Sequence, residues 1–221
     1  MKIGEEHSGR HIWLTCRHHA CESCASYVLE GVLSYLLHVP NPLVRHCLVH
    51  VLPFIDIDGV EDGDQGKGRI PHDHNRDYQQ PIYNVTKALY QYTENRPILM
   101  GFDFHDPGKW GGYQEINDHW SIVEGPQPYL KPQRQFSRIL EDVAREETLY
   151  SVQNNSVFGV DWNTQLQPSA WNFFFKRGAK VAFSLETPYF GDRAEPYSQD
   201  MLRHLGEKFA IAMQRYEEQY L

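Results

Sequence analysis

The sequence predicts an α/β fold in which helices cover both faces of a mixed, mostly parallel sheet. Two observations lead to this prediction. Apolar runs of strand length alternate with longer stretches of helical periodicity, which is the order of a parallel sheet with crossover helices. The chain has 221 residues, of which 41% are hydrophobic and 13% aromatic, so it can bury a substantial core. We therefore expect one three-layer α/β/α domain spanning residues 1–221.

The elements follow in order along the chain. Four apolar runs are predicted to be strands, at 11–16, 46–55, 97–104 and 179–185. Four amphipathic stretches are predicted to be helices, at 23–37, 81–95, 132–148 and 197–220. The first helix is expected to bury Tyr27, Val28, Val32, Leu33, Leu36 and Leu37. Three other segments are expected to lack regular structure: a glycine-rich functional loop at 56–69, a long surface loop at 106–130 and an irregular stretch at 150–175.

The net charge and the hydropathy of the chain argue against nucleic acid and membranes as partners. Twenty-one basic residues stand against 29 acidic ones, and the net charge of −8 argues against binding to nucleic acid or to an anionic membrane. No apolar run reaches the roughly 18 residues that span a bilayer. The first residues also lack the apolar core of a signal peptide. We therefore expect a cytoplasmic protein without a membrane partner.

Four cysteines lie in the first quarter of the chain, at Cys16, Cys21, Cys24 and Cys47. Cys21 and Cys24 form one CxxC motif, but a second is missing, so a structural zinc site with four cysteine ligands is not expected. Reduced thiols packed around a strand and a helix explain the pattern better. They agree with a reducing compartment.

His19 and Glu22 stand three residues apart between the first predicted strand and the first predicted helix. Side chains at this spacing on one turn point to the same side, so an imidazole and a carboxylate can hold one ion. Zinc accepts such ligands, and a catalytic zinc site needs a third protein ligand and an open position. His18 competes with His19, since His18 and Cys21 also have ligand spacing. By itself, the pair could equally be a solvated helix start with a capping glutamate.

Two further residues stand at the ends of predicted strands. His105 follows the strand at 97–104, and Glu186 follows the strand at 179–185. In parallel sheets, ligands bind beyond the carboxyl ends of the strands, so we expect these side chains to share one active site with His19 and Glu22. The alternatives are a hydrogen-bonded strand-end histidine and a buried structural glutamate.

The order of these motifs resembles the zinc metallocarboxypeptidase family, over about residues 10 to 190. Arg17-x-His19-x-x-Glu22 is similar to the Arg-x-His-Pro-Gly-Glu motif of the cytosolic and bacterial branches. The other matches are Asp56-Ile57-Asp58-Gly59 to Asn-Pro-Asp-Gly, Asp73-His74-Asn75-Arg76 to Asp-Leu-Asn-Arg, Phe104-His105 to the third ligand, and Ser184-Leu185-Glu186 to the strand of the catalytic glutamate. Four motifs in sequence are far more specific than any one of them.

The resemblance implies a role for each of these residues. His19, Glu22 and His105 would hold one zinc ion, and Glu186 would be the general base. Arg69 would stabilise the transition state, with Lys67 as the alternative. Asn75 and Arg76 would bind the terminal carboxylate of a peptide or small amide, and Tyr189 would take the place of the family's mobile tyrosine.

The sequence departs from the family at several points. Ala20-Cys21 replaces Pro-Gly between the first two ligands, and Asp106-Pro107 follows the third. The chain also begins where most members have already passed two strands, so a shortened or incomplete domain is an open alternative. Two other functions also stay open. One is an N-acyl amino acid deacylase of the aspartoacylase or succinylglutamate desuccinylase kind, and the other is a non-catalytic binding domain that retains the fold.

Overall fold

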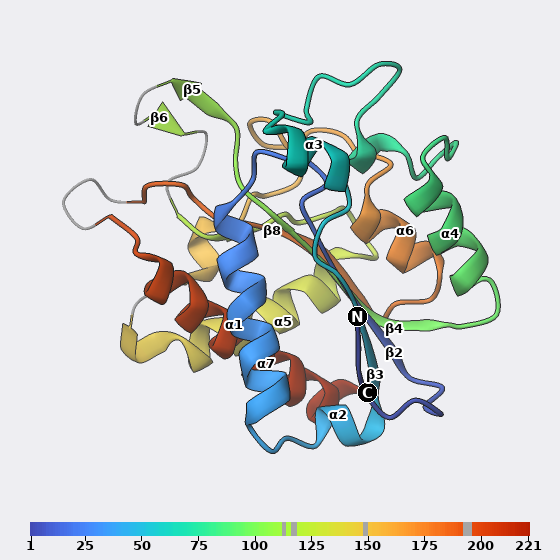
Figure 1. Cartoon of the computed structure of the whole chain (residues 1–221). Coiled ribbons are helices and arrows are strands. Elements are labelled where there is room, and N and C mark those ends of the chain that lie inside the picture. Colours follow the sequence, from blue (N-terminus) through green and yellow to red (C-terminus); the bar gives the residue numbers. More distant parts are fainter. Residues whose placement is uncertain (112–113, 116–118, 148–149, 192–195) are drawn as a thin grey trace.

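A six-stranded sheet forms the centre of the computed structural model, which describes all residues except 112–113, 116–118, 148–149 and 192–195 (Figure 1). The strand order is β1-β3-β2-β4-β8-β7. The inner strands β3 (Leu48–Leu52), β2 (His11–Cys16), β4 (Ile98–His105) and β8 (Val181–Glu186) are parallel. At the two edges, β1 (Lys2–Gly4) and β7 (Ser121–Ile122) pair antiparallel with their neighbours. The predicted mixed, mostly parallel sheet is confirmed.

Helices cover both faces of this sheet. On one face lie α1 (Cys24–His38), α5 (Leu130–Val143) and α7 (Gln199–Tyr220), and on the other lie α4 (Asn84–Thr93) and α6 (Ala170–Lys176) (Figure 1). The shorter elements are α2 (Leu43–His46), α3 (Ile57–Asp62), the 3₁₀ turns η1 (His74–Arg76), η2 (Arg145–Glu147) and η3 (Val152–Asn154), and the two-stranded pair β5 (Lys109–Gly111) and β6 (Gln114–Glu115). Among the described residues, none of these helices has both the length and the apolarity needed to cross a membrane.

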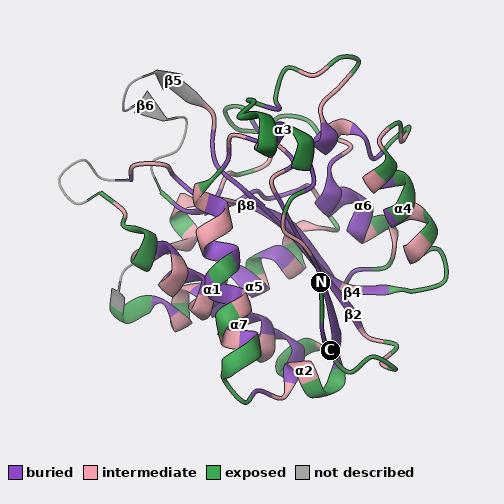
Figure 2. Ribbon diagram, viewed as in Figure 1, coloured by how far each residue is buried: buried purple, intermediate pink, exposed green. Residues whose placement is uncertain are grey.

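Side chains alternate along the inner strands and so contribute to two apolar cores, one on each face of the sheet. The inner strands themselves are buried (Figure 2). On β4, Phe102 and Phe104 belong to the core beneath α1, α5 and α7. Asp103 and His105 must then point to the opposite face, where α6 packs. The polar residues near the carboxyl ends of the strands are therefore directed away from the larger core and toward one side of the molecule.

Helices α1 and α7 approach each other at a pair of glycines. A Cβ atom at Gly31 would lie 1.9 Å from the carbonyl oxygen of Arg203, and one at Gly206 would lie 2.0 Å from that of Val28. Neither position has room for a side chain. The position of α1 against the sheet is thus set by close backbone contact with the last helix.

Several expected elements differ from the structure. Leu37 is 56% exposed, because the buried arc of α1 runs through Val28, Leu29, Val32 and Leu36, and position 37 lies outside it. The strand expected at 46–55 is shorter, since it covers only Leu48–Leu52.

The three segments expected to be irregular all contain regular structure. The loop at 56–69 begins with α3, because the carboxylate of Asp56 accepts the N–H of Gly59 and caps that helix. The loop at 106–130 includes β7, which covers the edge of β8, as well as β5 and β6. The stretch at 150–175 includes most of α6, whose seven residues are too few to show a helical period.

The buried ring of His50, which packs on Trp13 of the apolar core beneath α4 and α6, should make the stability of the fold depend on pH. Its ring stacks on Trp13 with centroids 4.3 Å apart, and its Nε2 lies 3.0 Å from Nδ1 of His11. Burial, together with the charges of His11 and Lys2, lowers the pKa of His50 to about 4. The unfolded chain takes up this proton near pH 6.5, so the folded state should lose about 2 kcal/mol of stability between pH 7 and pH 5. Urea unfolding at the two pH values measures this loss.

The matched variant is His50→Gln, which keeps a polar side chain but does not titrate. Its free energy of unfolding should fall less between pH 7 and pH 5 than that of the wild type. An equal fall in both proteins would show that His50 does not carry the pH dependence.

Candidate active site

His19, Glu22 and His105 meet beyond the carboxyl ends of β2 and β4. Nδ1 of His19 lies 2.7 Å from Oε1 of Glu22, and Nδ1 of His105 lies 2.7 Å from Oε2 of the same carboxylate. One ligand atom from each of the three residues lies within 4.8 Å of the others. The structure therefore brings the three predicted metal ligands together, although Glu22 and His105 are 83 positions apart in the chain.

The charges of this group compensate one another. Burial by itself would raise the pKa of Glu22, but His105 and His19 hold it well below its usual value. Burial would likewise lower the pKa of His105, but Asp103 and Glu22 raise it well above the ordinary value. Two imidazole nitrogens and one carboxylate are a donor set that zinc accepts, so the residues present fit the ion.

A carboxylate also stands behind each histidine. Oδ2 of Asp103 lies 2.6 Å from Nε2 of His105, and Oδ1 of Asp73 lies 3.5 Å from Nε2 of His19. A carboxylate at the far nitrogen favours the tautomer that leaves Nδ1 available as a ligand atom, an arrangement common in zinc sites. Both rings thus present Nδ1 to Glu22 and Nε2 to an acid.

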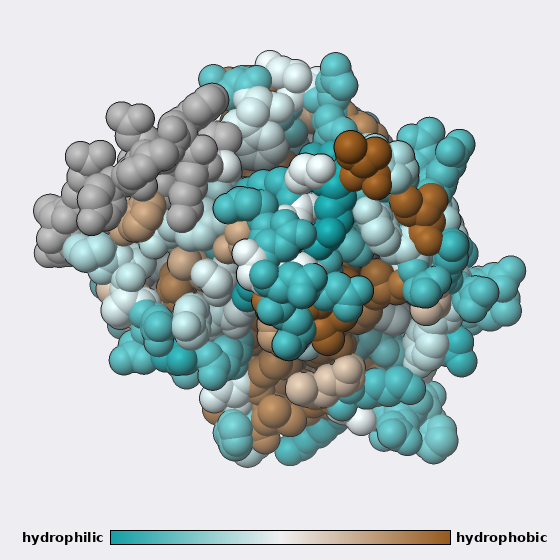
Figure 3. All heavy atoms as spheres, turned by 45° about the horizontal axis from the view of Figure 1, so that its top comes forward, coloured by the Kyte–Doolittle hydropathy of each residue, from teal (hydrophilic) through white to brown (hydrophobic). Residues whose placement is uncertain are grey.

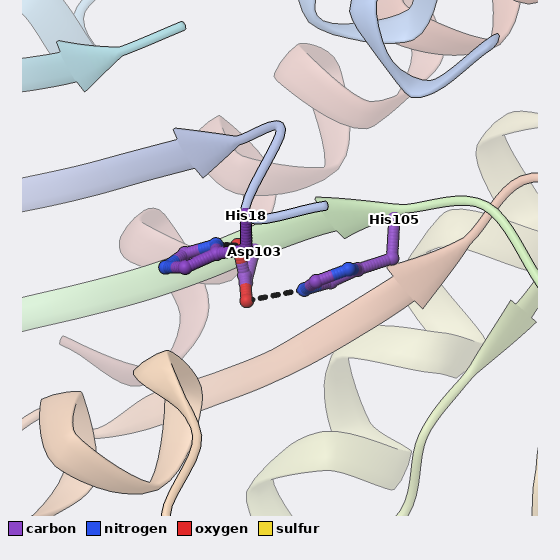
Figure 4. A group of neighbouring side chains, drawn as sticks. All are labelled: His18, Asp103 and His105. Atoms are coloured by element: carbon purple, nitrogen blue, oxygen red, sulfur yellow. Dashed lines mark hydrogen bonds and ion pairs between the residues drawn. The ribbon is translucent and has the colours of Figure 1, made fainter. Parts of the chain in front are cut away.

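A second cluster, formed by His18, Asp103 and His105, shares one histidine with the first (Figure 4). Nδ1 of His18 lies 2.9 Å from Oδ1 of Asp103, and Thr15 donates its hydroxyl to the same oxygen at 2.7 Å. Nε2 of His18 lies 2.8 Å from the hydroxyl of Tyr78. His18 and Asp103 are fully buried. Nδ1 of His18 lies at ion-pair distance from Asp103 but makes no hydrogen bond within the described part of the chain. This cluster therefore suits the support of His105, and the geometry favours His19 over His18 as the ligand.

The first group opens onto a cavity of about 340 Å³ on the side of the molecule where the strands end. This side is turned forward in Figure 3, where most of the surface is hydrophilic. The described residues lining the cavity are His19, Glu22, Lys67, Asp73, Asn75, Arg76, His105, Asp106, Pro107, Gly108, Val123, Trp162, Asn163, Gln165, Gln167, Ser169, Trp171, Ser184 and Glu186.

Glu186 ends β8, directly opposite His105 in the register of β4 and β8. Burial raises the pKa of its carboxyl group above the ordinary value, with a further contribution from Glu22, while His105 and Lys67 oppose the increase. A raised pKa in a cavity wall is typical of a carboxyl group that exchanges a proton during a reaction.

Lys67 reaches the cavity from the glycine-rich loop. Its Nζ lies 2.8 Å from Oε1 of Glu22. Gly66 has a φ of +75°, and a Cβ atom there would lie 2.5 Å from the amide nitrogen of Ala20. The amide of Cys21 also donates to the carbonyl oxygen of Gln65 at 3.3 Å. The loop is thereby packed against the backbone that carries His19 and Glu22, and Lys67 is brought to the carboxylate.

Arg69 lies outside the cavity, against Asp56 and Asp64. Its Nε and Nη2 donate to Oδ2 of Asp56 at 2.8 and 2.7 Å, and Nη2 lies 3.0 Å from Oδ2 of Asp64. It is not among the described residues that line the cavity. The geometry thus favours Lys67, the alternative considered from the sequence, over Arg69 as the cation of the site.

Asn75 and Arg76 both line the cavity. Asn75 is held by the amide of Ala170, which donates to its Oδ1 at 3.3 Å, and its Nδ2 lies 3.2 Å from Nε2 of His105. Asp73 accepts the backbone amides of Asn75 and Arg76. Tyr189 is close to the ligand loop, with its hydroxyl 3.8 Å from Sγ of Cys21, but it is not one of the described residues of the cavity wall.

Three kinds of residue lie in or beside this candidate site without having been assigned to it from the sequence. Asp103 could have been found, since it precedes His105 by two positions and so shares its side of a strand. Asp73 is the acid of the Asn-Arg motif, but its pairing with His19 depends on tertiary structure. Trp162 and Trp171 line the cavity from a segment that the sequence suggested to be irregular. No local pattern marks such residues as part of a site.

His72 and His74 are engaged outside this site. Nε2 of His72 lies 2.7 Å from Oδ1 of Asp77. The ring of His74 stacks on that of Tyr83, with the ring centroids 3.8 Å apart. Neither belongs to a potential metal-binding group among the described residues.

Comparisons with known proteins place this geometry in context. No protein-family model matches the sequence, and no curated protein does. Solved structures do match. The metallo-carboxypeptidase of Pseudomonas aeruginosa in complex with (2-guanidinoethylmercapto)succinic acid superposes with a TM-score of 0.78 at 16% identity, over 98% of this chain and 60% of that one. The metallo-carboxypeptidase of Burkholderia cenocepacia gives a TM-score of 0.75 at 14% identity, over 100% of this chain and 61% of that one. The chain has the metallo-carboxypeptidase fold.

A structure with a lower TM-score is the mDAP-bound form of Csd4 of Helicobacter pylori, a D,L-carboxypeptidase. It matches with a TM-score of 0.62 at 13% identity, over 98% of this chain and 54% of that one. The chain thus spans about 60% of the length of the metallo-carboxypeptidases named above.

Removing a predicted ligand tests the metal assignment. His105→Ala should bind zinc roughly 100-fold more weakly or not at all, because it removes one of three ligands. Zinc per chain, measured by elemental analysis after dialysis, checks this result. The control is His72→Ala, which removes an imidazole outside the group and should leave zinc content unchanged. Equal zinc content in the wild type and His105→Ala would remove His105 from the ligand set.

Proposed function

We propose that the chain is a zinc-dependent metallocarboxypeptidase that cleaves a peptide or amide bond next to a free carboxylate. The observation that carries the proposal is the convergence of His19, Glu22 and His105 with Glu186 around one cavity, in a chain with the metallo-carboxypeptidase fold. Zinc held by the three ligands would polarise the scissile carbonyl group and lower the pKa of a water molecule.

Glu186 is proposed to move the proton. Its carboxylate lies in the cavity wall opposite His105, and its raised pKa suits a group that takes a proton from water and later gives it to the leaving amine. It is not part of the metal-binding group formed by His19, Glu22 and His105. It can therefore serve as base without giving up a ligand.

Lys67 is proposed to stabilise negative charge on the reacting carbonyl oxygen. It is the only lysine among the described residues that line the cavity. Its ammonium group lies next to Glu22, one of the predicted ligands. A positive charge that is already in position stabilises the oxyanion without any rearrangement of the site during the reaction. The raised pKa of Lys67, to which Glu22 contributes against the effect of burial, keeps this group charged.

Arg76 is proposed to bind the carboxylate of the substrate, together with Asn75. Within the described part of the chain, its guanidinium group has no ion pair, and its Nη1 donates to the carbonyl oxygen of Asn75 at 3.5 Å. The neighbouring acids have other partners, since Asp73 accepts backbone amides and Asp77 contacts His72. A guanidinium group can accept a carboxylate in a bidentate pair. The succinic acid derivative in the Pseudomonas aeruginosa structure, which carries carboxylates, supports a ligand of this kind.

The decisive test is Glu186→Gln. This change removes the proton acceptor and keeps the size of the side chain, so kcat on peptides with a free C-terminus should fall by about 10²- to 10⁴-fold. Zinc content should stay unchanged. Both are measured on the same zinc-loaded preparations, with a panel of peptides, C-terminally amidated peptides and N-acyl amino acids as substrates.

Each arm of this panel has a distinct meaning. Turnover of N-acyl amino acids with no peptide cleavage would identify a deacylase instead. A wild-type protein that holds no zinc and turns over none of these substrates would indicate a non-catalytic binding domain. A normal rate in Glu186→Gln would reject Glu186 as the base.

Replacing Lys67 and Arg69 one at a time tests which of the two stabilises negative charge during the reaction. Lys67→Met should lower kcat by about 10²-fold or more, because it removes positive charge next to the reacting oxygen. Arg69→Met removes an equivalent charge outside the cavity and should change kcat by less than about threefold once the protein is shown to be folded. Steady-state kinetics with zinc at saturation checks both. The reverse ranking would return the role to Arg69.

A further inference from the structure

Asp106 is a buried acid next to a predicted ligand, and the mechanism above makes no use of it. It follows His105 at the end of β4 and is 1% exposed. Its Oδ2 accepts the backbone amide of Cys24 at 2.8 Å, and its Oδ1 accepts that of Ala25 at 2.6 Å. Both oxygens are thereby bonded to the first turn of α1, whose start lies two residues after Glu22.

Helix α1 has no cap of its own. Ser23 stands at the N-cap position and makes no side-chain hydrogen bond to the helix, and no acidic residue lies in the first turn. The first amides of a helix have no partner within the helix, and leaving them buried and unpaired costs free energy. Asp106 supplies these hydrogen bonds from a strand 82 positions away in the chain.

We propose that Asp106 is a positioning residue that sets the distance between the two segments carrying the zinc ligands. It is joined to His105 by one peptide bond and to the residues just after Glu22 by two hydrogen bonds, one to each of its carboxyl oxygens. Two directional bonds to successive amides fix the start of α1 relative to the end of β4. The 2.7 Å separation between Nδ1 of His105 and Oε2 of Glu22 is maintained by this link. The inference rests on the ligand assignment in the proposed function.

A merely structural role would explain the capping but not an effect on the metal site. Loss of a helix cap costs about 1 kcal/mol of stability wherever the helix lies. Loss of a link between two ligand segments weakens metal binding even in protein that is fully folded, because the ligands must then be ordered at the time of binding. Metal affinity in folded protein therefore separates the two roles.

The experiment compares zinc affinity in three folded proteins, by competition with a chromogenic chelator. Asp106→Asn replaces one acceptor oxygen by an amide group that faces a backbone N–H, and zinc affinity should fall by about 10- to 100-fold. The matched control is Ser198→Ala, because Ser198 caps α7 by accepting the amide of Met201 at 3.2 Å. This variant also loses a helix cap, but far from the ligand segments, and should bind zinc within about twofold of the wild type.

Each outcome decides a different claim. If Asp106→Asn binds zinc as tightly as Ser198→Ala, the positioning role is overturned while the ligands stand. If the wild type itself binds no zinc, the ligand assignment fails instead. Should Asp106→Asn not fold, Asp106→Glu keeps both oxygens but displaces them by one methylene group. A zinc affinity equal to that of the wild type in this variant would also overturn the proposal, and a weaker one would support it.

Discussion

The site depends on one buried carboxylate, that of Glu22. Its two oxygens contact two different imidazoles, at the same distance of 2.7 Å, and the ammonium group of Lys67 lies near one of them. A carboxylate without positive partners could not be buried here, because desolvation of the charge would be too costly. The three segments that bring these partners therefore have to meet at this residue, and the rest of the sheet edge is arranged around that meeting.

The parallel sheet makes this meeting possible. Strands β2, β4 and β8 run in the same direction, so their carboxyl ends deliver the ligand loop, His105 and Glu186 to a single edge. Alternation along β4 then directs Asp103 and His105 to the same face, away from the core formed by Phe102 and Phe104. The result is a polar cavity built on the ends of the strands, with loop residues such as Lys67 and Trp162 completing its wall.

The parts of this arrangement that follow from local pattern could be predicted from the sequence. The apolar runs gave the inner strands, and the strand-end positions of His105 and Glu186 gave the edge at which they meet. The antiparallel edge strands β1 and β7 were missed because two or three residues are too few to show alternation. The sequence comparison favoured Arg69 over Lys67 as the catalytic cation, although both lie in the same loop and nothing local shows which of them reaches the cavity. Tertiary contacts distinguish them, since Lys67 reaches Glu22 in the cavity and Arg69 pairs with Asp56 outside it.

The glycine pair between α1 and α7 connects the last helix to the cavity. Backbone contact at Gly31 and Gly206 leaves no space for even a methyl group. The same helix α1 begins beside the loop that carries His19 and Glu22, and a displacement at the middle of a rigid helix also moves its end. A change in the packing of α7 near the carboxyl terminus would therefore shift α1 and, through it, the positions of His19 and Glu22, although α7 contributes none of the described residues that line the cavity.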